Sequence, residues 1–131
     1  MILGFIGFGE VGFELAHGLK QEGLTKIVAF DPLSEDPKYG PLVQSRARDA
    51  GVALQPNPQA VAEAADVIIT AVPGSKALTA ALDLAPSLRA PQVYADVSTS
   101  TAASKKQMAL AVESTGALFV DGALMGGLSM Q

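Results

Sequence analysis

Short runs of apolar residues alternate with longer amphipathic segments along the whole chain. A short apolar run bounded by glycine or proline is typical of a buried strand, whereas apolar positions spaced three and four residues apart indicate a helix. The run Val67-Ile68-Ile69 is β-branched throughout, which favours a strand most strongly. The predicted strands are 2–6, 26–30, 52–54, 66–72, 92–96 and 117–120, and the predicted helices are 10–22, 42–50, 59–65, 75–88 and 101–114.

The regular alternation of strands and helices predicts the fold class. Successive strands joined by helices pair in parallel through right-handed crossovers. Six strands in this rhythm predict an α/β, doubly wound, mostly parallel Rossmann sheet with helices on both faces. We expect an exposed loop over 31–40 and a helix N-cap at Ser75. The length of 131 residues suits one such domain, residues 1–131.

Composition supports this fold and argues against several functions. Apolar residues make up 49% of the chain and aromatic residues 5%, which suits a sheet buried by helices on both faces. The net charge of −4 provides no basic face for nucleic acid. Without cysteine, and with His17 as the lone histidine, the sequence predicts no disulfide and no metal site. No apolar run is long enough to cross a bilayer, so we expect a cytoplasmic protein without membrane contact.

The strongest chemical signal is a G-x-G-x-x-G sequence that follows the first predicted strand and opens the first predicted helix. Gly7 would allow the sharp turn out of the strand, Gly9 the close approach of a pyrophosphate, and Gly12 the close packing of the helix on the sheet. The free N–H groups and positive dipole end of the helix would face the phosphates. The residues predicted to bind a dinucleotide here are Gly7, Phe8, Gly9, Glu10, Val11 and Gly12.

An acidic residue completes this fingerprint. Asp31 ends the second predicted strand, about twenty residues after Gly12, where its carboxylate could accept hydrogen bonds from the adenosine ribose. The same carboxylate would repel a 2′-phosphate, and no arginine follows it, so NAD is favoured over NADP as the cofactor. The alternative is that the glycines are ordinary turn residues and that Asp31 only starts a turn before Pro32.

Two other classes of protein use glycine-rich loops, and both fit poorly. A P-loop phosphotransferase needs the sequence G-x-x-x-x-G-K-[ST], and the chain has no such lysine. A methyltransferase that uses S-adenosylmethionine usually has an acidic residue leading into its glycines, where Phe5 and Ile6 stand in this chain.

Further candidates follow the fourth and fifth predicted strands, because the ligand of an open α/β sheet lies over the carboxyl ends of its strands. Val72 and Pro73 could flank the dinucleotide, although a simple strand stop explains them equally well. Ser98 and Thr99 belong to a run of hydroxyls that could hold nicotinamide or substrate. The alternative for this run is a helix cap, for which Thr101 is the natural residue.

The segment after the sixth predicted strand is rich in glycine and methionine. Gly126 and Gly127 could offer backbone N–H groups to an anion, or the segment could be a flexible linker. Its apolar residues predict an exposed packing surface that could support a homodimer, and these are Leu124, Met125, Leu128 and Met130.

Three segments together resemble a known family. They are Gly4-Phe5-Ile6-Gly7-Phe8-Gly9-Glu10-Val11-Gly12, Asp96-Val97-Ser98-Thr99 and Phe119-Val120-Asp121-Gly122-Ala123-Leu124-Met125-Gly126-Gly127. Over essentially its whole length the chain is similar to the amino-terminal domain of β-hydroxyacid dehydrogenases, which include 3-hydroxyisobutyrate and 6-phosphogluconate dehydrogenases. The resemblance implies a domain that binds NAD or NADP in an enzyme that oxidises a small hydroxy acid by hydride transfer.

The resemblance also implies roles for individual residues, most of which the chain's own chemistry already suggests. The implied contacts are 7–12 with the pyrophosphate, Asp31 with the ribose, Val72 and Pro73 with the cofactor, Ser98 with nicotinamide and substrate, and Thr99, Gly126 and Gly127 with the substrate.

The chain departs from the family pattern in two places. Met125 stands where the family usually has a serine, which puts substrate contact at that position in doubt. The family's general acid/base lysine lies on a helix of an all-helical second domain, which we expect to be absent here, and neither Lys76 nor Lys105 has a matching position. Oxidation of an alcohol needs a group that takes the hydroxyl proton. We therefore predict no catalytic residue in this chain and no activity of the chain alone.

Two hypotheses follow from the sequence. The first is the NAD-binding domain of an oxidoreductase of the β-hydroxyacid dehydrogenase type. The second is a stand-alone, non-catalytic module that senses NAD or binds a partner. A downstream helical segment that carries a lysine would support the first hypothesis, and a stop codon would support the second.

Overall fold

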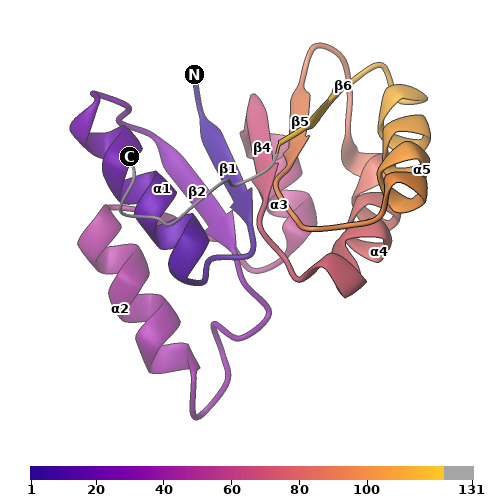
Figure 1. The fold of residues 1–131 in the computed structure, drawn as a ribbon. Coiled ribbons are helices and arrows are strands. Elements are labelled where there is room, and N and C mark those ends of the chain that lie inside the picture. The colour runs from indigo at the N-terminus through magenta and orange to yellow at the C-terminus, as the bar shows by residue number, and fades with distance from the viewer. Residues whose placement is uncertain (123–131) are drawn as a thin grey trace.

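The computed structural model describes residues 1–122. Six parallel strands form one sheet in the order β3-β2-β1-β4-β5-β6 (Figure 1). This order confirms the predicted doubly wound Rossmann sheet. The elements are β1 (Leu3–Ile6), α1 (Glu10–Gln21), β2 (Ile27–Phe30), α2 (Gly40–Ala50), β3 (Ala53–Leu54), α3 (Pro58–Ala64), β4 (Val67–Thr70), α4 (Gly74–Leu84), a 3₁₀ turn (Ala85–Ser87), β5 (Val93–Asp96), α5 (Ala102–Glu113) and β6 (Leu118–Asp121).

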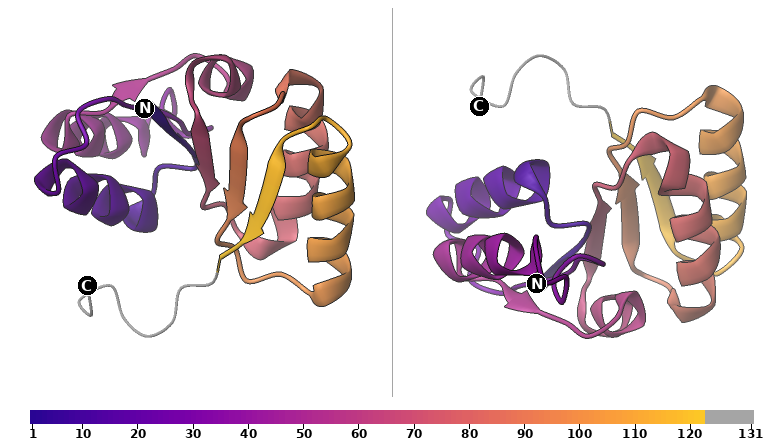
Figure 2. Two further views of the ribbon diagram at one scale, coloured as in Figure 1. Left: turned by 90° about the horizontal axis from the view of Figure 1, so that it is seen from above. Right: turned by 90° about the horizontal axis from the view of Figure 1, so that it is seen from below.

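Helices cover both faces of the sheet, and each face has its own apolar core (Figure 2). α1 and α2 pack over the half that contains β1, β2 and β3, where Phe5 and Ala16 are fully buried. α3, α4 and α5 cover the opposite face, where Ile68 and Met108 are fully buried. The alternation of side chains along each strand supplies both cores, because successive residues point to opposite faces.

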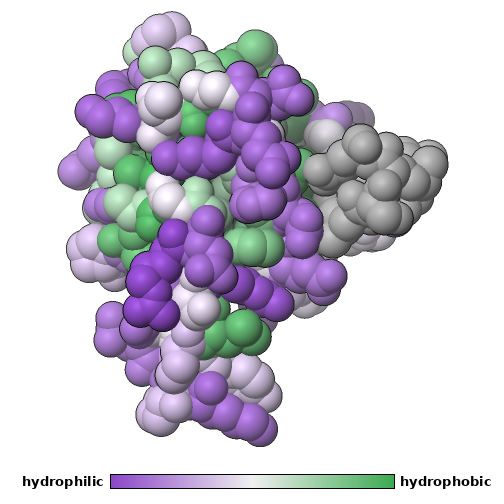
Figure 3. Space-filling view, turned by 90° about the vertical axis from the view of Figure 1, so that its left-hand side faces the viewer, coloured by the Kyte–Doolittle hydropathy of each residue, from purple (hydrophilic) through white to green (hydrophobic). Residues whose placement is uncertain are grey.

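Hydrophilic side chains predominate on the side of the molecule formed by α1 and α2, with smaller apolar patches between them (Figure 3). Single large apolar side chains are exposed on three helices, namely Leu42 on α2, Leu82 on α4 and Leu110 on α5. The edge strand β6 also exposes apolar side chains, because Leu118 and Val120 are 56% and 40% exposed.

Two helix starts differ in how well the sequence predicted them. Thr101 caps α5 by accepting a hydrogen bond from the Ser104 N–H at 3.1 Å, which was the alternative weighed for that hydroxyl. The prediction of Ser75 as the cap of α4 is wrong, because α4 already begins at Gly74 and has no side-chain cap. The backbone at Gly74 lies against the carbonyl oxygen of Thr99 and leaves no room for a Cβ. With this contact the helix begins at Gly74, one residue before the predicted cap at Ser75.

Gly7 makes the turn out of β1. Its φ of +91° is disfavoured for residues with a side chain, and its N–H donates a hydrogen bond to the Phe30 carbonyl oxygen at 2.8 Å. A Cβ built at Gly7 would lie 2.7 Å from the Ala71 carbonyl oxygen. The turn therefore requires glycine both for its dihedral angle and for the space between the loops after β1 and β4.

We predict that Gly7→Ala lowers the free energy of unfolding by about 2–4 kcal/mol, because it adds a steric clash to backbone strain. Gly23→Ala is the matched control, since Gly23 has a similar φ of +102° but open space around its Cβ position. Urea unfolding of both variants measures the difference. Equal losses of stability at the two positions would contradict this view of the turn.

Candidate functional site

The carboxyl ends of the strands meet at one edge of the sheet, where the strand order reverses between β1 and β4. β1 leads into α1 on one face and β4 leads into α4 on the other, so the two connections diverge. Ligands of open α/β sheets bind at such a reversal point. Two pockets open along this edge, and Val72 contributes to both.

The larger pocket, which we call the apolar pocket, has a volume of about 410 Å³. It lies between the ends of β1 and β2 and one side of α4. Its walls are mostly hydrocarbon, and the few polar groups come from α4. The apolar lining residues are Ile6, Phe30, Pro32, Pro58, Val72, Ala80 and Leu84, and the polar ones are Ser75, Lys76, Thr79 and Asp83.

The smaller pocket, which we call the hydroxyl pocket, has a volume of about 250 Å³ and lies between the start of α1 and the ends of β4 and β5. It brings together five residues that the sequence singled out from three separate segments. These are Val11, Val72, Pro73, Ser98 and Thr99, and Ala71, Gly74 and Val97 complete the lining.

The glycine loop leaves the amino end of α1 open. Gly9 is the N-cap residue and forms no side-chain cap, and the Phe13 N–H donates to the Gly9 carbonyl oxygen at 2.9 Å. The earlier N–H groups of a helix have no intrahelical partner. A Cβ built at Gly9 would meet nothing within 4 Å, so the backbone there borders open space. At Gly12, by contrast, a Cβ would lie 2.9 Å from the Gly7 carbonyl oxygen, so the helix packs tightly against the turn.

Asp31 connects the glycine loop to the end of β2. Its side chain is buried, and Oδ2 accepts a hydrogen bond from the Phe8 N–H at 2.7 Å. Oδ1 accepts from the Leu33 N–H at 2.8 Å. The Phe8 ring is fully buried beside Phe5, so it anchors the glycine loop to the core. Each carboxylate oxygen can accept a second hydrogen bond, so these contacts leave acceptor capacity for a ligand.

A charged cluster that sequence reasoning missed lies at the ends of β5 and β6. The Asp96 side chain is fully buried, and its carboxylate accepts hydrogen bonds from the Thr70 hydroxyl at 2.7 Å and the Ser98 hydroxyl at 2.6 Å. The Lys105 Nζ lies 2.8 Å from Asp96 Oδ2 and 2.6 Å from Asp121 Oδ1. We call Thr70, Asp96, Ser98, Lys105 and Asp121 the Asp96 cluster. No local pattern marks Lys105, because its partners lie at the ends of two different strands, β5 and β6.

Lys105 and the neighbouring Tyr94 both have raised pKa values. Burial alone would lower the pKa of Lys105, but its hydrogen bonds and charge interactions with Asp121 and Asp96 outweigh burial and raise it above the ordinary 10.5. Burial raises the pKa of the Tyr94 phenol far above the ordinary 10.0, and the Asp96 charge adds to this. Thr70 lies beside Tyr94 but donates its hydrogen to Asp96, and the Tyr94 hydroxyl has no hydrogen-bond partner of acceptable geometry among residues 1–122.

Several sequence predictions lie outside the described residues. These are the glycine pair Gly126 and Gly127, the departure at Met125, and the apolar surface that includes Leu124, Leu128 and Met130. Within residues 1–122, no three histidine, cysteine or acidic residues gather in a way that could hold a metal ion. No helix in the same range is long and apolar enough to span a membrane.

One protein-family model spans all the residues discussed above. The family model described as the NAD binding domain of 6-phosphogluconate dehydrogenase matches residues 2–130. The chain belongs to this family of NAD-binding domains. A nicotinamide dinucleotide is therefore the cofactor class of the domain, which agrees with the glycine loop at the reversal point of the sheet.

Named relatives confirm the resemblance to β-hydroxyacid dehydrogenases. The NAD-binding domain is 32% identical to human mitochondrial 3-hydroxyisobutyrate dehydrogenase over 130 residues, which cover 96% of this chain and 36% of the relative. The domain thus spans little more than a third of the length of the curated relatives it matches.

Solved structures show the same fold. A conserved hypothetical protein from Sinorhizobium meliloti 1021 is 29% identical with a TM-score of 0.89, covering 98% of this chain and 43% of that one. The Mycobacterium tuberculosis 3-hydroxyisobutyrate dehydrogenase, solved with L-serine, is 26% identical with a TM-score of 0.83 and the same two coverages.

We predict that the NAD-binding domain loses stability as the pH rises above about 10. Tyr94 and Lys105 hold their protons more tightly in the folded state, so their contribution is complete below their ordinary pKa values and is lost as the pH rises through the raised ones. Melting temperatures between neutral pH and pH 11 measure the loss.

Tyr94→Phe isolates the tyrosine contribution. Since the Tyr94 hydroxyl has no hydrogen-bond partner within residues 1–122, this variant should be at least as stable as the wild type at neutral pH and should lose less stability at alkaline pH. Parallel alkaline losses in the two proteins would contradict the assignment.

Proposed function

We propose that this domain binds NAD across the reversal point of the sheet and forms the cofactor half of an enzyme that oxidises a small hydroxy acid. One observation carries the proposal: the uncapped amino end of α1 borders open space at Gly9, beside pockets that differ in chemistry. A dinucleotide joins an apolar base and a polar amide through a charged bridge, and these parts match the apolar pocket, the hydroxyl pocket and the glycine loop in chemistry. Residues 1–131 would constitute the cofactor domain, and a second domain would lie elsewhere in the full-length enzyme.

The pyrophosphate would bind at the glycine loop. The unpaired N–H groups at the start of α1 and the positive end of the helix dipole both favour an anion there. The backbone of Gly9 is accessible because no side chain stands in front of it. Glu10 and Val11 would contribute backbone N–H groups, and Gly7, Phe8 and Gly12 would hold the loop in the shape that exposes them.

The adenine would occupy the apolar pocket. A flat aromatic base needs a pocket with mostly apolar walls and a few polar groups at its rim, and this is the composition of the apolar pocket. Val72 and Pro73 follow β4, and Val72 would separate the adenine from the nicotinamide because it lines both pockets.

The ribose of the adenosine would bind to Asp31, and this carboxylate would favour NAD over NADP. Asp31 lies beside the glycine loop, and its carboxylate accepts two main-chain hydrogen bonds. Glu35 and Asp36 add negative charge to the same loop, while the Lys38 ammonium lies over the Tyr39 ring, 5.2 Å from its centre. A 2′-phosphate would therefore meet an acidic surface.

The nicotinamide and the substrate would meet at the hydroxyl pocket. Ser98 and Thr99 line it, with Gly126 and Gly127 proposed as further substrate contacts. The names of the relatives, for 3-hydroxyisobutyrate and with L-serine bound, support a small hydroxy acid as substrate. When bound, the nicotinamide supplies the hydride acceptor. None of the residues placed here is positioned as the base for the hydroxyl proton, so we propose that this base belongs to the second domain.

We predict that NADH binds at least about tenfold more tightly than NADPH, because a carboxylate beside a 2′-phosphate costs 1.4 kcal/mol or more, on the order of a tenfold change. Isothermal titration of the folded domain with each nucleotide measures the ratio. Asp31→Asn is the matched variant and should narrow the preference. Failure of both nucleotides to bind would remove the cofactor proposal, and tighter binding of NADPH would remove the role of Asp31.

We also predict that Gly9→Ala leaves the melting temperature within about 2 °C but weakens NADH binding at least about tenfold. The added methyl group meets no protein atom and would occupy the space of the pyrophosphate. Calorimetric titration and thermal unfolding of the same sample provide both values. Unchanged affinity in the stable variant would place the phosphates elsewhere.

A further inference from the structure

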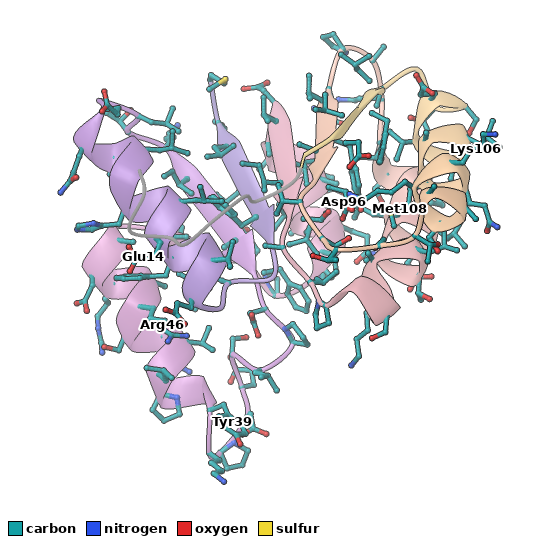
Figure 4. The ribbon with its side chains drawn as sticks, in the orientation of Figure 1. Glu14, Tyr39, Arg46, Asp96, Lys106 and Met108 are labelled. Carbon is teal, nitrogen blue, oxygen red and sulfur yellow. The ribbon has the colours of Figure 1, made fainter. Side chains whose placement is uncertain are left out.

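The Asp96 cluster includes the hydroxyl of Ser98, a residue that lines the hydroxyl pocket. Asp96 lies inside the molecule, whereas the neighbouring lysine on α5, Lys106, points away into solvent (Figure 4). Lys105 is the cation that pairs with the buried Asp96 carboxylate, and its side chain is only 11% exposed. A fully buried carboxylate is strongly disfavoured without such a partner. Lys105 therefore supplies the cation that compensates the buried Asp96 carboxylate.

The ionised carboxylate fixes the direction of the hydrogen bonds around it. A carboxylate without a proton can only accept, so the single hydroxyl hydrogen of Ser98 points to Asp96. The Ser98 and Ser100 oxygens lie 2.7 Å apart, and Ser100 must donate in this pair because Ser98 has no second hydrogen. Ser98 then retains one acceptor position, on a residue that lines the hydroxyl pocket.

The location of Lys105 is unfavourable for the helix itself. It lies in the first turn of α5, where a cation opposes the helix dipole. Its Nζ also lies 3.1 Å from the Asp96 carbonyl oxygen and thus reaches the backbone at the end of β5. The lysine therefore links the ends of β5 and β6, and its contacts stabilise the strand ends rather than the helix.

We propose that Lys105 is a positioning residue that, through Asp96, holds the Ser98 hydroxyl as a hydrogen-bond acceptor for the carboxamide N–H of the nicotinamide. This inference rests on the proposed binding of NAD at the hydroxyl pocket. The carboxamide is the donor at that end of the cofactor, and an acceptor of fixed direction would set the rotation of the ring. Without the lysine, the Asp96 carboxylate would lose the cation that holds it in place, and the Ser98 hydroxyl would no longer be held in one direction.

The test compares NAD with its 3-acetylpyridine analogue, in which a methyl group replaces the amide nitrogen and removes the donor. We expect the wild-type domain to bind NAD about three- to tenfold more tightly than the analogue, the range of one neutral hydrogen bond. Lys105→Met should reduce the ratio to about one, and Lys105→Arg should retain it. ADP-ribose, which lacks the nicotinamide, should bind equally to all three proteins.

Lys106→Met is the matched control, because it removes the same charge from the exposed side of α5 and should leave the ratio unchanged. If Lys105→Met does not fold, the double variant Asp96→Asn with Lys105→Met removes both buried charges together and should also reduce the ratio. A folded Lys105 variant, single or double, with the full wild-type ratio would overturn the inference, as would a wild-type ratio near one. If neither NAD nor ADP-ribose binds the wild type, both the proposed function and this inference fail.

Discussion

The turn from β1 to α1 must bring unpaired main-chain N–H groups next to open space, and the rest of the site depends on that constraint. Gly7 allows the turn at a positive φ, Gly12 lets the helix pack against it, and Gly9 leaves its outer side free of atoms. A side chain at any of the three would alter either the turn or the space in front of it. Such an arrangement of backbone N–H groups is suited to binding an anion.

Two buried carboxylates maintain the two ends of this site by different means. Asp31 holds the glycine loop by accepting hydrogen bonds from the main-chain N–H groups of Phe8 and Leu33. Asp96 is stabilised by a lysine and two hydroxyls, and it orders the residues after β5. In both cases the carboxylate orders neighbouring groups beside the proposed cofactor site. We propose that Asp31 favours ribose hydroxyls over a 2′-phosphate there, and that Asp96 holds Ser98 as an acceptor for the nicotinamide amide.

The sequence predicted those parts of the site that depend on local pattern. The six strands, the glycine loop and the position of Asp31 at the end of β2 follow from periodicity and spacing within short segments. The sequence could not predict contacts between distant loops. The error at Ser75 arose because Gly74 packs against the carbonyl of Thr99, and the partners of Lys105 come from β5 and β6. Such contacts are set by the assembled sheet edge, which no local pattern describes.

The central claim is that the main-chain N–H groups at the start of α1 bind the pyrophosphate. Amide proton–nitrogen NMR spectra of the domain during titration with NAD test it most directly. We expect the largest shifts at residues 8–12, with smaller shifts along the two pockets, and we expect the shifts at 8–12 to disappear in Gly9→Ala. Unmoved resonances at 8–12, together with large shifts elsewhere on the domain, would contradict the account.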